Sequence, residues 1–302
     1  MTIRQEMLHL ASLARNRLRS RGRRVAAFLT GRLNDDGGFG GRGPASDLYY
    51  TVFGLEGLLA LAGPAAGFPP GRTRAYLQSF AAGGQLDLVH LCSLVRCWAG
   101  IGDDAWWAQR RGQILQRLGV FRSADGGYSP AAGAPRGTVY ACFLALGACQ
   151  DLGWALPDPE GVLRCVESLK AADGGYANQE DLPVGSVPAT AAAVTTLRHL
   201  GKPVDPALGD WLLGCHCPGG GFLAMPLAPE PDLLSTATAL FALRMMQAPL
   251  EPIARGCLEF VEALQHPSGG WRGGAAEQQP DCEYTYYALL SLGILGSTTK
   301  IT

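Results

Sequence analysis

One short pattern recurs along the chain and limits the folds that it can adopt. Two adjacent glycines precede an aromatic residue, a polar loop of about ten residues follows, and an apolar run then begins. The aromatic residues of the pattern, separated by 89, 48, 46 and 49 residues, are Phe39, Tyr128, Tyr176, Phe222 and Trp271. The long first gap has room for one further copy, which the sequence supplies in weaker form at Gly83-Gly84. Self-similarity at this period predicts a repeat protein with six units.

Each unit is expected to contain two helices. The last unit, SGGWRGGAAEQQPDCEYTYYALLSLGILG, runs from Ser268 to Gly296. Its segment from Tyr284 to Leu295 is apolar on every face, which predicts a helix buried on all sides. Amphipathic segments such as Ile253 to Leu264 precede the turns and predict outer helices. The predicted inner helices begin near positions 47, 87, 136, 186, 232 and 281.

Six helical hairpins of this kind bury all of their apolar surface if they close into a ring. The sequence therefore predicts an all-α fold, an (α/α)6 barrel or toroid that forms a single domain over residues 1–302. An open superhelix is the alternative. It requires terminal repeats with a polar outer face, and neither end of the chain shows one, which favours closure.

Composition narrows the class of protein further. The chain has 302 residues, of which 47% are hydrophobic and 17% charged, enough for a sizeable core. Glu56 interrupts the longest apolar run, and no segment typical of a signal peptide begins the chain. The nine cysteines are scattered through apolar runs, as expected for reduced core residues. We therefore expect a cytoplasmic protein that does not bind nucleic acid.

Residues 1–32 differ in charge from the rest of the chain. This basic, helical N-terminal segment carries eight arginines against Glu6, a net charge of +7, whereas the remainder carries −8. Leu10, Leu13, Leu18 and Val25 give it an apolar stripe. We expect a solvated outer helix, because runs of charge usually face water. The alternative is peripheral contact with anionic lipid or with an acidic partner.

The repeats resemble those of a known family. The units DGGFGGRGPASDLYYTVFGLEGLLALAG (Asp36 to Gly63) and Ser268 to Gly296 are similar to repeats of protein prenyltransferase β subunits, especially the Rab geranylgeranyltransferase type. They are more distantly similar to squalene and oxidosqualene cyclases. The resemblance implies a central cavity that binds an isoprenoid and a prenyltransferase-like or cyclase-like activity. It also implies a helical partner subunit of the kind that prenyltransferases have.

The resemblance also implies metal ligands that this chain lacks. The family holds zinc with an Asp-x-Cys at the start of an inner helix and a His from the next hairpin. Here Asp281 is kept, Glu283 stands at the thiolate position, and Tyr50 stands where the His is expected. Zinc prefers nitrogen and sulfur donors, so we predict that no zinc is bound. Cations are also missing at the family's diphosphate positions, and we expect Mg²⁺ only together with a bound diphosphate.

The starts of the inner helices form the predicted site. The candidate catalytic residues are Asp281, Glu283, Tyr284 and Tyr50, since crowded carboxylates raise one another's pKa and Asp281-Cys282 resembles the Asp-Cys pair of oxidosqualene cyclases. Candidate substrate-binding residues are the aromatic and polar side chains on or just before inner helices: Tyr49, Phe53, His90, Trp98, Tyr140, Phe241, Tyr286, Tyr287, Asp47, Asp87 and Asp232. Each aspartate also suits a helix N-cap, and His90 suits a structural hydrogen bond. The alternative to an enzyme is a non-catalytic protein that binds an isoprenoid or a protein partner.

Overall fold

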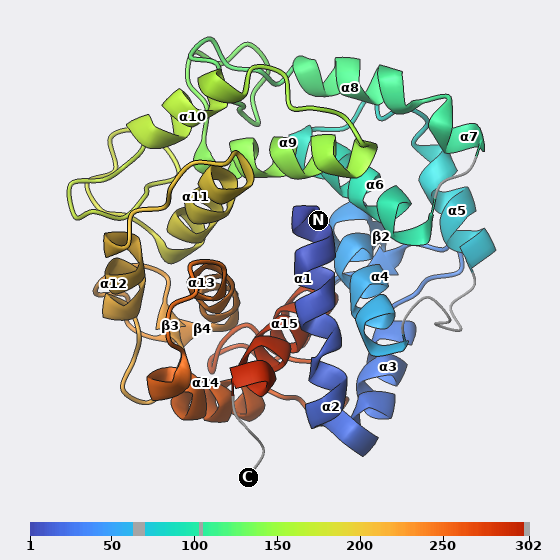
Figure 1. The fold of residues 1–302 in the computed structure, drawn as a ribbon. Coiled ribbons are helices and arrows are strands. Elements are labelled where there is room, and N and C mark those ends of the chain that lie inside the picture. Colours follow the sequence, from blue (N-terminus) through green and yellow to red (C-terminus); the bar gives the residue numbers. More distant parts are fainter. Residues whose placement is uncertain (63–69, 103–104, 299–302) are drawn as a thin grey trace.

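A computed structural model describes residues 1–62, 70–102 and 105–298. In these residues six inner helices follow one another around a ring, and each packs against the next. The last of them packs against the first, so the toroid is closed (Figure 1). The inner helices are α4 (Leu48–Ala62), α6 (Leu88–Ile101), α9 (Val139–Leu152), α11 (Val187–His199), α13 (Leu233–Met245) and α15 (Cys282–Thr298).

The outer helices surround this ring and precede the turns, as the sequence predicts. They are α3 (Gly22–Thr30), α5 (Pro70–Ser79), α8 (Arg111–Gly119), α10 (Pro159–Ser168), α12 (Ala207–Gly214) and α14 (Glu251–Ala263), with a short α7 (Ala105–Ala108) before α8. The prediction of an all-α toroid is confirmed. Within the described residues, the named strands are short ladders that pair β1 (Phe39–Gly40) with β2 (Ser46–Asp47) and β3 (Phe222–Leu223) with β4 (Pro231–Asp232).

The glycine pair and its aromatic residue have a repeated structural role. Gly269, the first glycine of the last pair, has a φ of 107°, a backbone conformation that glycine adopts without strain. Trp271 follows the pair, is fully buried, and donates its backbone N–H to the Thr285 hydroxyl at 3.1 Å. The same bond joins Phe222 to Thr236 at 2.9 Å. Both turns are thus fastened to the inner helix that follows them.

The inner helices begin where capping side chains stand. Asp47, Asp87, Asp232 and Asp281 each accept backbone N–H groups of the first turn, which satisfies donors that have no partner within the helix. The third helix starts later than the predicted position 136. Thr138 is its cap and accepts from the backbone N–H of Ala141, because Gly137 is held by Asp125 instead.

The expectation of an outer helix at the N-terminus is wrong for its first part. Helix α1 (Ile3–Ser12) lies inside the ring, where it packs on α15, α4 and α9, and α2 (Ala14–Leu18) continues along α15 (Figure 1). The apolar stripe of this segment faces inward: Ile3, Met7, Leu10, Ala11, Ala14 and Leu18 are buried. Only α3 is an outer helix, after a 3-10 turn η1 (Arg19–Arg21). Charge counting did not reveal that one face of α1 is apolar enough to be enclosed.

A glycine on α15 makes room for α1. A side chain on Gly293 would place its Cβ 1.9 Å from the carbonyl oxygen of Leu10, so only glycine allows the two backbones to approach this closely. Of the helices that the structure describes, none has both the length and the apolar character needed to cross a lipid bilayer.

Candidate functional site

A cavity of about 450 Å³ lies inside the toroid, between α1 and the inner helices. Its wall is mostly apolar, with small residues such as Ala189 and Ala192 on α11 opposite larger side chains. The aromatic part of the wall consists of Tyr49, Phe53, Tyr140, Phe143, Phe241 and Tyr287. The cavity is thus a concave, largely apolar chamber of the size that small-molecule pockets have.

The aromatic residues contact one another across neighbouring helices. Tyr49 and Phe53 lie one turn apart on α4, with ring centroids 4.9 Å apart in an edge arrangement. The ring of Phe53 is 5.5 Å from that of Tyr287 on α15. Such contacts fix the ring orientations and present both edges and faces to the cavity. The faces are suited to a hydrocarbon chain and to a positive charge that forms on it.

Glu283 connects the start of α15 to this wall. The Tyr49 hydroxyl, which lines the cavity, donates to the Glu283 carboxylate at 2.6 Å. Burial raises the pKa of Glu283 to about 7, although the bond from Tyr49 acts in the opposite direction. A carboxyl with this pKa is partly protonated near neutral pH and is able to donate a proton.

The other candidate catalytic residues form a structural cluster beside the cavity. Asp281 is fully buried, caps α15, and accepts from Nε of Arg42 at 3.2 Å. Burial raises the pKa of Asp281, whereas its hydrogen bonds to the α15 backbone and to Arg42 oppose the rise. Arg42 also faces the ring of Tyr284 at 5.6 Å. Tyr50 packs against Gly41 in the loop before α4, and none of these residues lines the cavity.

His90 joins the caps of two adjacent inner helices. Its Nδ1 is 2.9 Å from Asp87, the cap of its own helix, and its Nε2 is 3.2 Å from Asp47, the cap of α4. Burial lowers the pKa of His90, but the bonds to the two carboxylates outweigh burial and raise it. These residues lie at the rim and do not line the cavity, which agrees with the structural alternative for His90.

Arg4, Arg96 and Asp151, which the sequence analysis did not propose as site residues, line the opposite end of the cavity, and Glu56 lies behind Arg96. Arg4 of α1 pairs with Asp151 of α9 at 3.3 Å, and Arg96 of α6 pairs through two bonds with Glu56 of α4. Burial raises the pKa of Asp151 to about 6, against the opposing charges of Arg4 and Arg96. The available signal was the presence of charges inside otherwise apolar helices at positions 56, 96 and 151. We refer to Arg4, Asp151, Arg96 and Glu56 as the inner charged group.

A family model for the prenyltransferase alpha-alpha toroid domain matches residues 64–201 and 190–302. The chain belongs to this family. A variant of the type II terpene cyclase MstE from Scytonema, in complex with geranylgeranyl dihydroxybenzoate as substrate, has a similar structure. Its TM-score is 0.66 and its identity 13%, covering 98% of this chain and 100% of that chain. No curated protein matches this chain in sequence.

Two further solved structures share the fold of this family member. A protein from Actinoplanes has a TM-score of 0.61 and 18% identity, covering 92% of this chain and 98% of its own. Protein geranylgeranyltransferase-I from Candida albicans, complexed with GGPP, has a TM-score of 0.54 and 12% identity, covering 71% and 86%. At these identities the likeness establishes the prenyltransferase-like and terpene cyclase-like fold alone.

The toroid brings some predicted residues to the cavity and not others. Tyr49, Phe53, Tyr140, Phe241 and Tyr287 line it. Trp98 does not, because it faces outward from α6 and stacks on Trp106 and Trp107 at 5.4 and 5.2 Å. Tyr286 is fully buried between helices, and Asp47, Asp87 and Asp232 remain at the helix starts, outside the lining. The 3.6-residue period of a helix explains why adjacent Tyr286 and Tyr287 face different sides.

The residues that replace the family's zinc ligands are engaged elsewhere. Asp281 binds Arg42, Glu283 binds Tyr49, and the Cys282 thiol lies 3.9 Å from the carbonyl oxygen of Gly40. Across residues 1–62, 70–102 and 105–298, His, Cys, Asp and Glu side chains do not gather in threes as a metal site requires. The absence of zinc stays a prediction.

Proposed function

We propose that this protein binds an isoprenoid chain in the central cavity. The aromatic and aliphatic lining of a chamber of about 450 Å³ inside the toroid is the observation that supports the proposal. An isoprenoid is a long, flexible hydrocarbon, and burying its surface against such a wall is favourable. Proteins with the same fold hold geranylgeranyl dihydroxybenzoate or GGPP, which are molecules of this class.

A substitution that fills the cavity tests the proposal. Ala192→Phe adds a ring to the wall on α11, and the ring competes with the ligand for the same space. We expect calorimetric titration with geranylgeraniol to give a Kd at least about tenfold weaker than wild type, about 1.4 kcal/mol or more. The control is Ala131→Phe, in the exposed loop before α9. The proposal is wrong if wild type does not bind the alcohol or if both variants bind it equally well.

A catalytic role is the second candidate function, and the contact between Glu283 and Tyr49 favours it. The π electrons of a bound double bond take the Tyr49 hydroxyl proton while Tyr49 regains a proton from Glu283. The resulting carbocation faces the rings of Phe53 and Tyr287. Loss of a proton from carbon back through Tyr49 to the Glu283 carboxylate restores both groups. The scheme needs no oxidant and resembles cyclase chemistry. Asp281, Tyr284 and Tyr50 then position the start of α15.

Turnover and binding are separable by mutation. Glu283→Gln keeps a polar group beside Tyr49 but removes the proton, so we expect unchanged binding and loss of product formation from geranylgeranyl substrates, measured by mass spectrometry. Glu259→Gln, an exposed carboxylate of α14 that pairs with Arg255 outside the cavity, is the control. If wild type binds the isoprenoid but leaves it unchanged, the protein is a non-catalytic isoprenoid binder, as in the alternative hypothesis.

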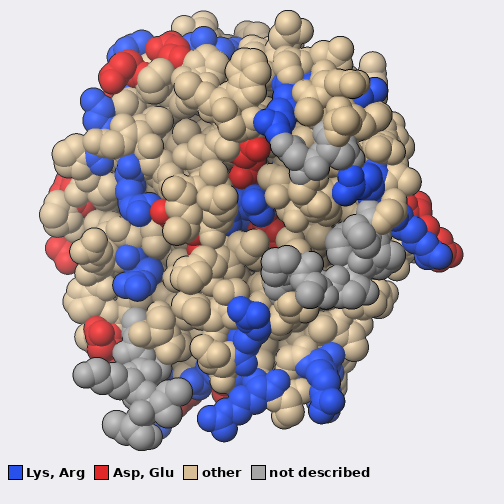
Figure 2. Space-filling view, turned by 45° about the vertical axis from the view of Figure 1, so that its right-hand side comes forward, with Lys and Arg blue, Asp and Glu red and all other residues tan. Residues whose placement is uncertain are grey.

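Only part of the basic N-terminal segment is accessible for the predicted contact with a membrane. Since α1 is enclosed, the exposed arginines of the N-terminal segment are Arg15, Arg19, Arg21, Arg23 and Arg24, and basic side chains gather at the lower edge of Figure 2. Arg17 and Arg21 pair with Glu262 of α14. We propose that the remaining charges attract anionic lipid, which sedimentation with phosphatidylserine vesicles tests. A helical partner subunit, a cytoplasmic location and Mg²⁺ bound with a diphosphate also stay predictions.

A further inference from the structure

The inner charged group places two arginines, each paired with an acid, at the α1 end of the cavity. We propose that Arg4 and Arg96 bind the anionic head of an isoprenoid ligand, a phosphate or a carboxylate, at the α1 end of the cavity. The inference rests on the proposed function and adds the class and the orientation of the ligand. The head points toward α1 and the hydrocarbon chain lies along the aromatic wall.

Arg96 reaches the face of α1 that carries Arg4. Nη2 of Arg96 is 3.9 Å from the sulfur of Met7, and Met7 is three residues after Arg4, on the same face of α1. Arg4, Met7 and Arg96 all line the cavity. Asp151, which pairs with Arg4 at 3.3 Å, lines the same cavity. Both arginines therefore present donors to one cavity, beside the same face of α1.

The cations face the cavity more than the acids do. The side chain of Arg4 is 12% exposed and that of its partner Asp151 is 4% exposed. For Arg96 and Glu56 the values are 19% and 1%. Glu56 holds the Arg96 guanidinium from behind, whereas Asp151 lies in the wall beside Arg4, and the two arginines are the more exposed members of the group. The described contacts with the acids use Nε and Nη2 of Arg96 and Nε of Arg4, so each planar group has further N–H donors for a phosphate or carboxylate.

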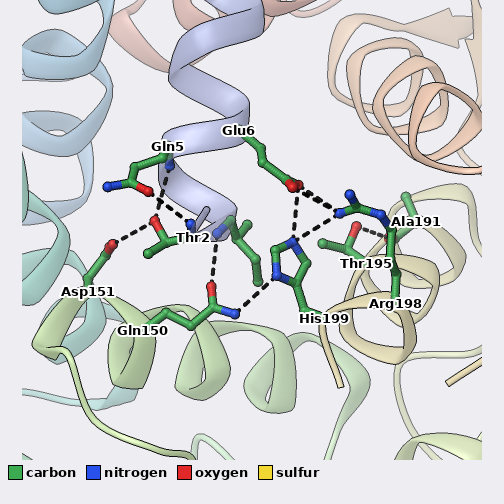
Figure 3. A network of polar contacts seen from close by, with 10 residues as sticks. Thr2, Gln5, Glu6, Gln150, Asp151, Ala191, Thr195, Arg198 and His199 are labelled. Atoms are coloured by element: carbon green, nitrogen blue, oxygen red, sulfur yellow. Dashed lines mark hydrogen bonds and ion pairs between the residues drawn. The ribbon is translucent and has the colours of Figure 1, made fainter. Parts of the chain in front are cut away.

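The first turn of α1 is fixed in place, which holds Arg4 ready for a ligand. The backbone N–H of Ile3 donates to Gln150 at 2.9 Å, and the Thr2 hydroxyl donates to Asp151 at 3.3 Å (Figure 3). On the other side of the turn, Glu6 pairs with Arg198 at 2.9 Å and contacts His199 at 3.1 Å (Figure 3). Little side-chain entropy remains to be lost on binding, which strengthens affinity.

The inner charged group has no net positive charge with which to attract an anion. Two cations and two acids balance, so the group attracts an anion through directed N–H donors and not through excess charge. The low polarity of the surrounding wall strengthens each such bond. An uncharged isoprenoid alcohol makes at most a single hydrogen bond there, whereas a phosphate or carboxylate accepts several. The preference for an anionic head is therefore the quantity to measure.

The test compares ligands with one chain and different heads. Geranylgeranyl phosphate, geranylgeranoic acid, geranylgeraniol and inorganic phosphate are titrated separately into the full-length protein. We expect wild type to bind the phosphate ester at least about tenfold more tightly than the alcohol. Arg4→Gln reduces this ratio to below about threefold and leaves the affinity for the alcohol within about twofold of wild type. The acid probe shows whether a carboxylate suffices, and inorganic phosphate shows whether the chain is required.

Controls separate the site from general charge and from folding. Arg17→Gln removes an arginine of α2 that pairs with Glu262, outside the cavity, and keeps the wild-type ratio. The double variant Arg96→Gln/Glu56→Gln removes the second cation without leaving a buried charge alone, and it also lowers the ratio. A ratio near one in wild type, or an unchanged ratio in folded Arg4→Gln, overturns the inference. If neither the alcohol nor the esters bind, the proposed function itself fails.

Discussion

The two ends of the cavity carry charges for different reasons. At the start of the inner helices, Asp47, Asp87, Asp232 and Asp281 satisfy backbone N–H groups that otherwise have no partner. At the α1 end, the inner charged group caps no helix, and its members come from four different helices. Burying four charges away from water costs free energy that helix formation does not require. Charges with a structural reason are weak evidence for function, so the inner end is the better place to look for ligand recognition.

The position of α1 makes this difference possible, and displacing it has the largest expected effect. Gly293→Ala places a methyl group against the Leu10 carbonyl, and we expect unfolding by urea to show a loss of about 3 kcal/mol. Gly296→Ala, on the same helix with open space around it, changes stability by less than about 1 kcal/mol. Equal effects of the two variants would mean that α1 is not packed on α15 as described.

Titration of a buried carboxyl at each end sharpens the comparison. The pKa of Glu283 is raised above its ordinary value to about 7, so the folded state holds that proton more tightly than the unfolded state. Its contribution to stability is therefore lost as the pH rises through 7. We expect wild type to become roughly 2 kcal/mol less stable between pH 5 and pH 8 from this group, when chemical unfolding is followed.

Glu283→Gln removes that part of the pH dependence, and Asp151→Asn removes a separate part at the other end, which is lost as the pH rises to about 6. The groups that set the environment of Glu283 are Tyr49, Asp281, Arg42 and Glu277. A pH profile that neither substitution alters would show that both carboxyls titrate normally. The carboxyls at the starts of the inner helices and at the α1 end of the cavity would then not differ as argued.

Removing a cap at the start of an inner helix has a smaller expected effect. Asp87→Ala removes the acceptor for the His90 backbone N–H, and we expect a loss of about 1 kcal/mol with ligand affinity unchanged. Asp35→Ala, an exposed carboxylate in the loop before the first turn, changes stability by less than about 0.5 kcal/mol. A large loss of isoprenoid binding in folded Asp87→Ala would contradict the structural role of the aspartates that cap the inner helices.

The toroid was predictable from the sequence because the information that specifies it is local and repeated. Gly269-Gly270-Trp271 and its copies mark each turn, and runs such as Tyr284 to Leu295 mark each buried helix. The caps at Asp87 and Asp232 followed from the same pattern, and so did Tyr49, Phe53 and Tyr287 on the cavity wall.

The inner charged group was not predictable, because its contacts join parts of the chain that are far apart in the sequence. Arg4 and Asp151 are 147 residues apart, and the pairing depends on α1 entering the ring. An amphipathic helix with a basic end suits the surface or the interior equally well until its neighbours are known. Trp98 was misplaced for a different reason. It is an aromatic residue on an inner helix, but its position on that helix directs it to the outer layer, where it stacks on Trp107.

Photolabelling tests most directly the claim that the cavity holds an isoprenoid with its head toward α1. A geranylgeranyl phosphate that carries a diazirine at the far end of its chain is bound, irradiated and mapped by peptide mass spectrometry. We predict labels on the peptides that contain Tyr49 and Phe53 of α4 and Tyr140 of α9, and competition by unlabelled geranylgeranyl phosphate. Labels on α1 peptides near Met7 would reverse the orientation. Labels confined to surface peptides, unaffected by competition, would contradict the account.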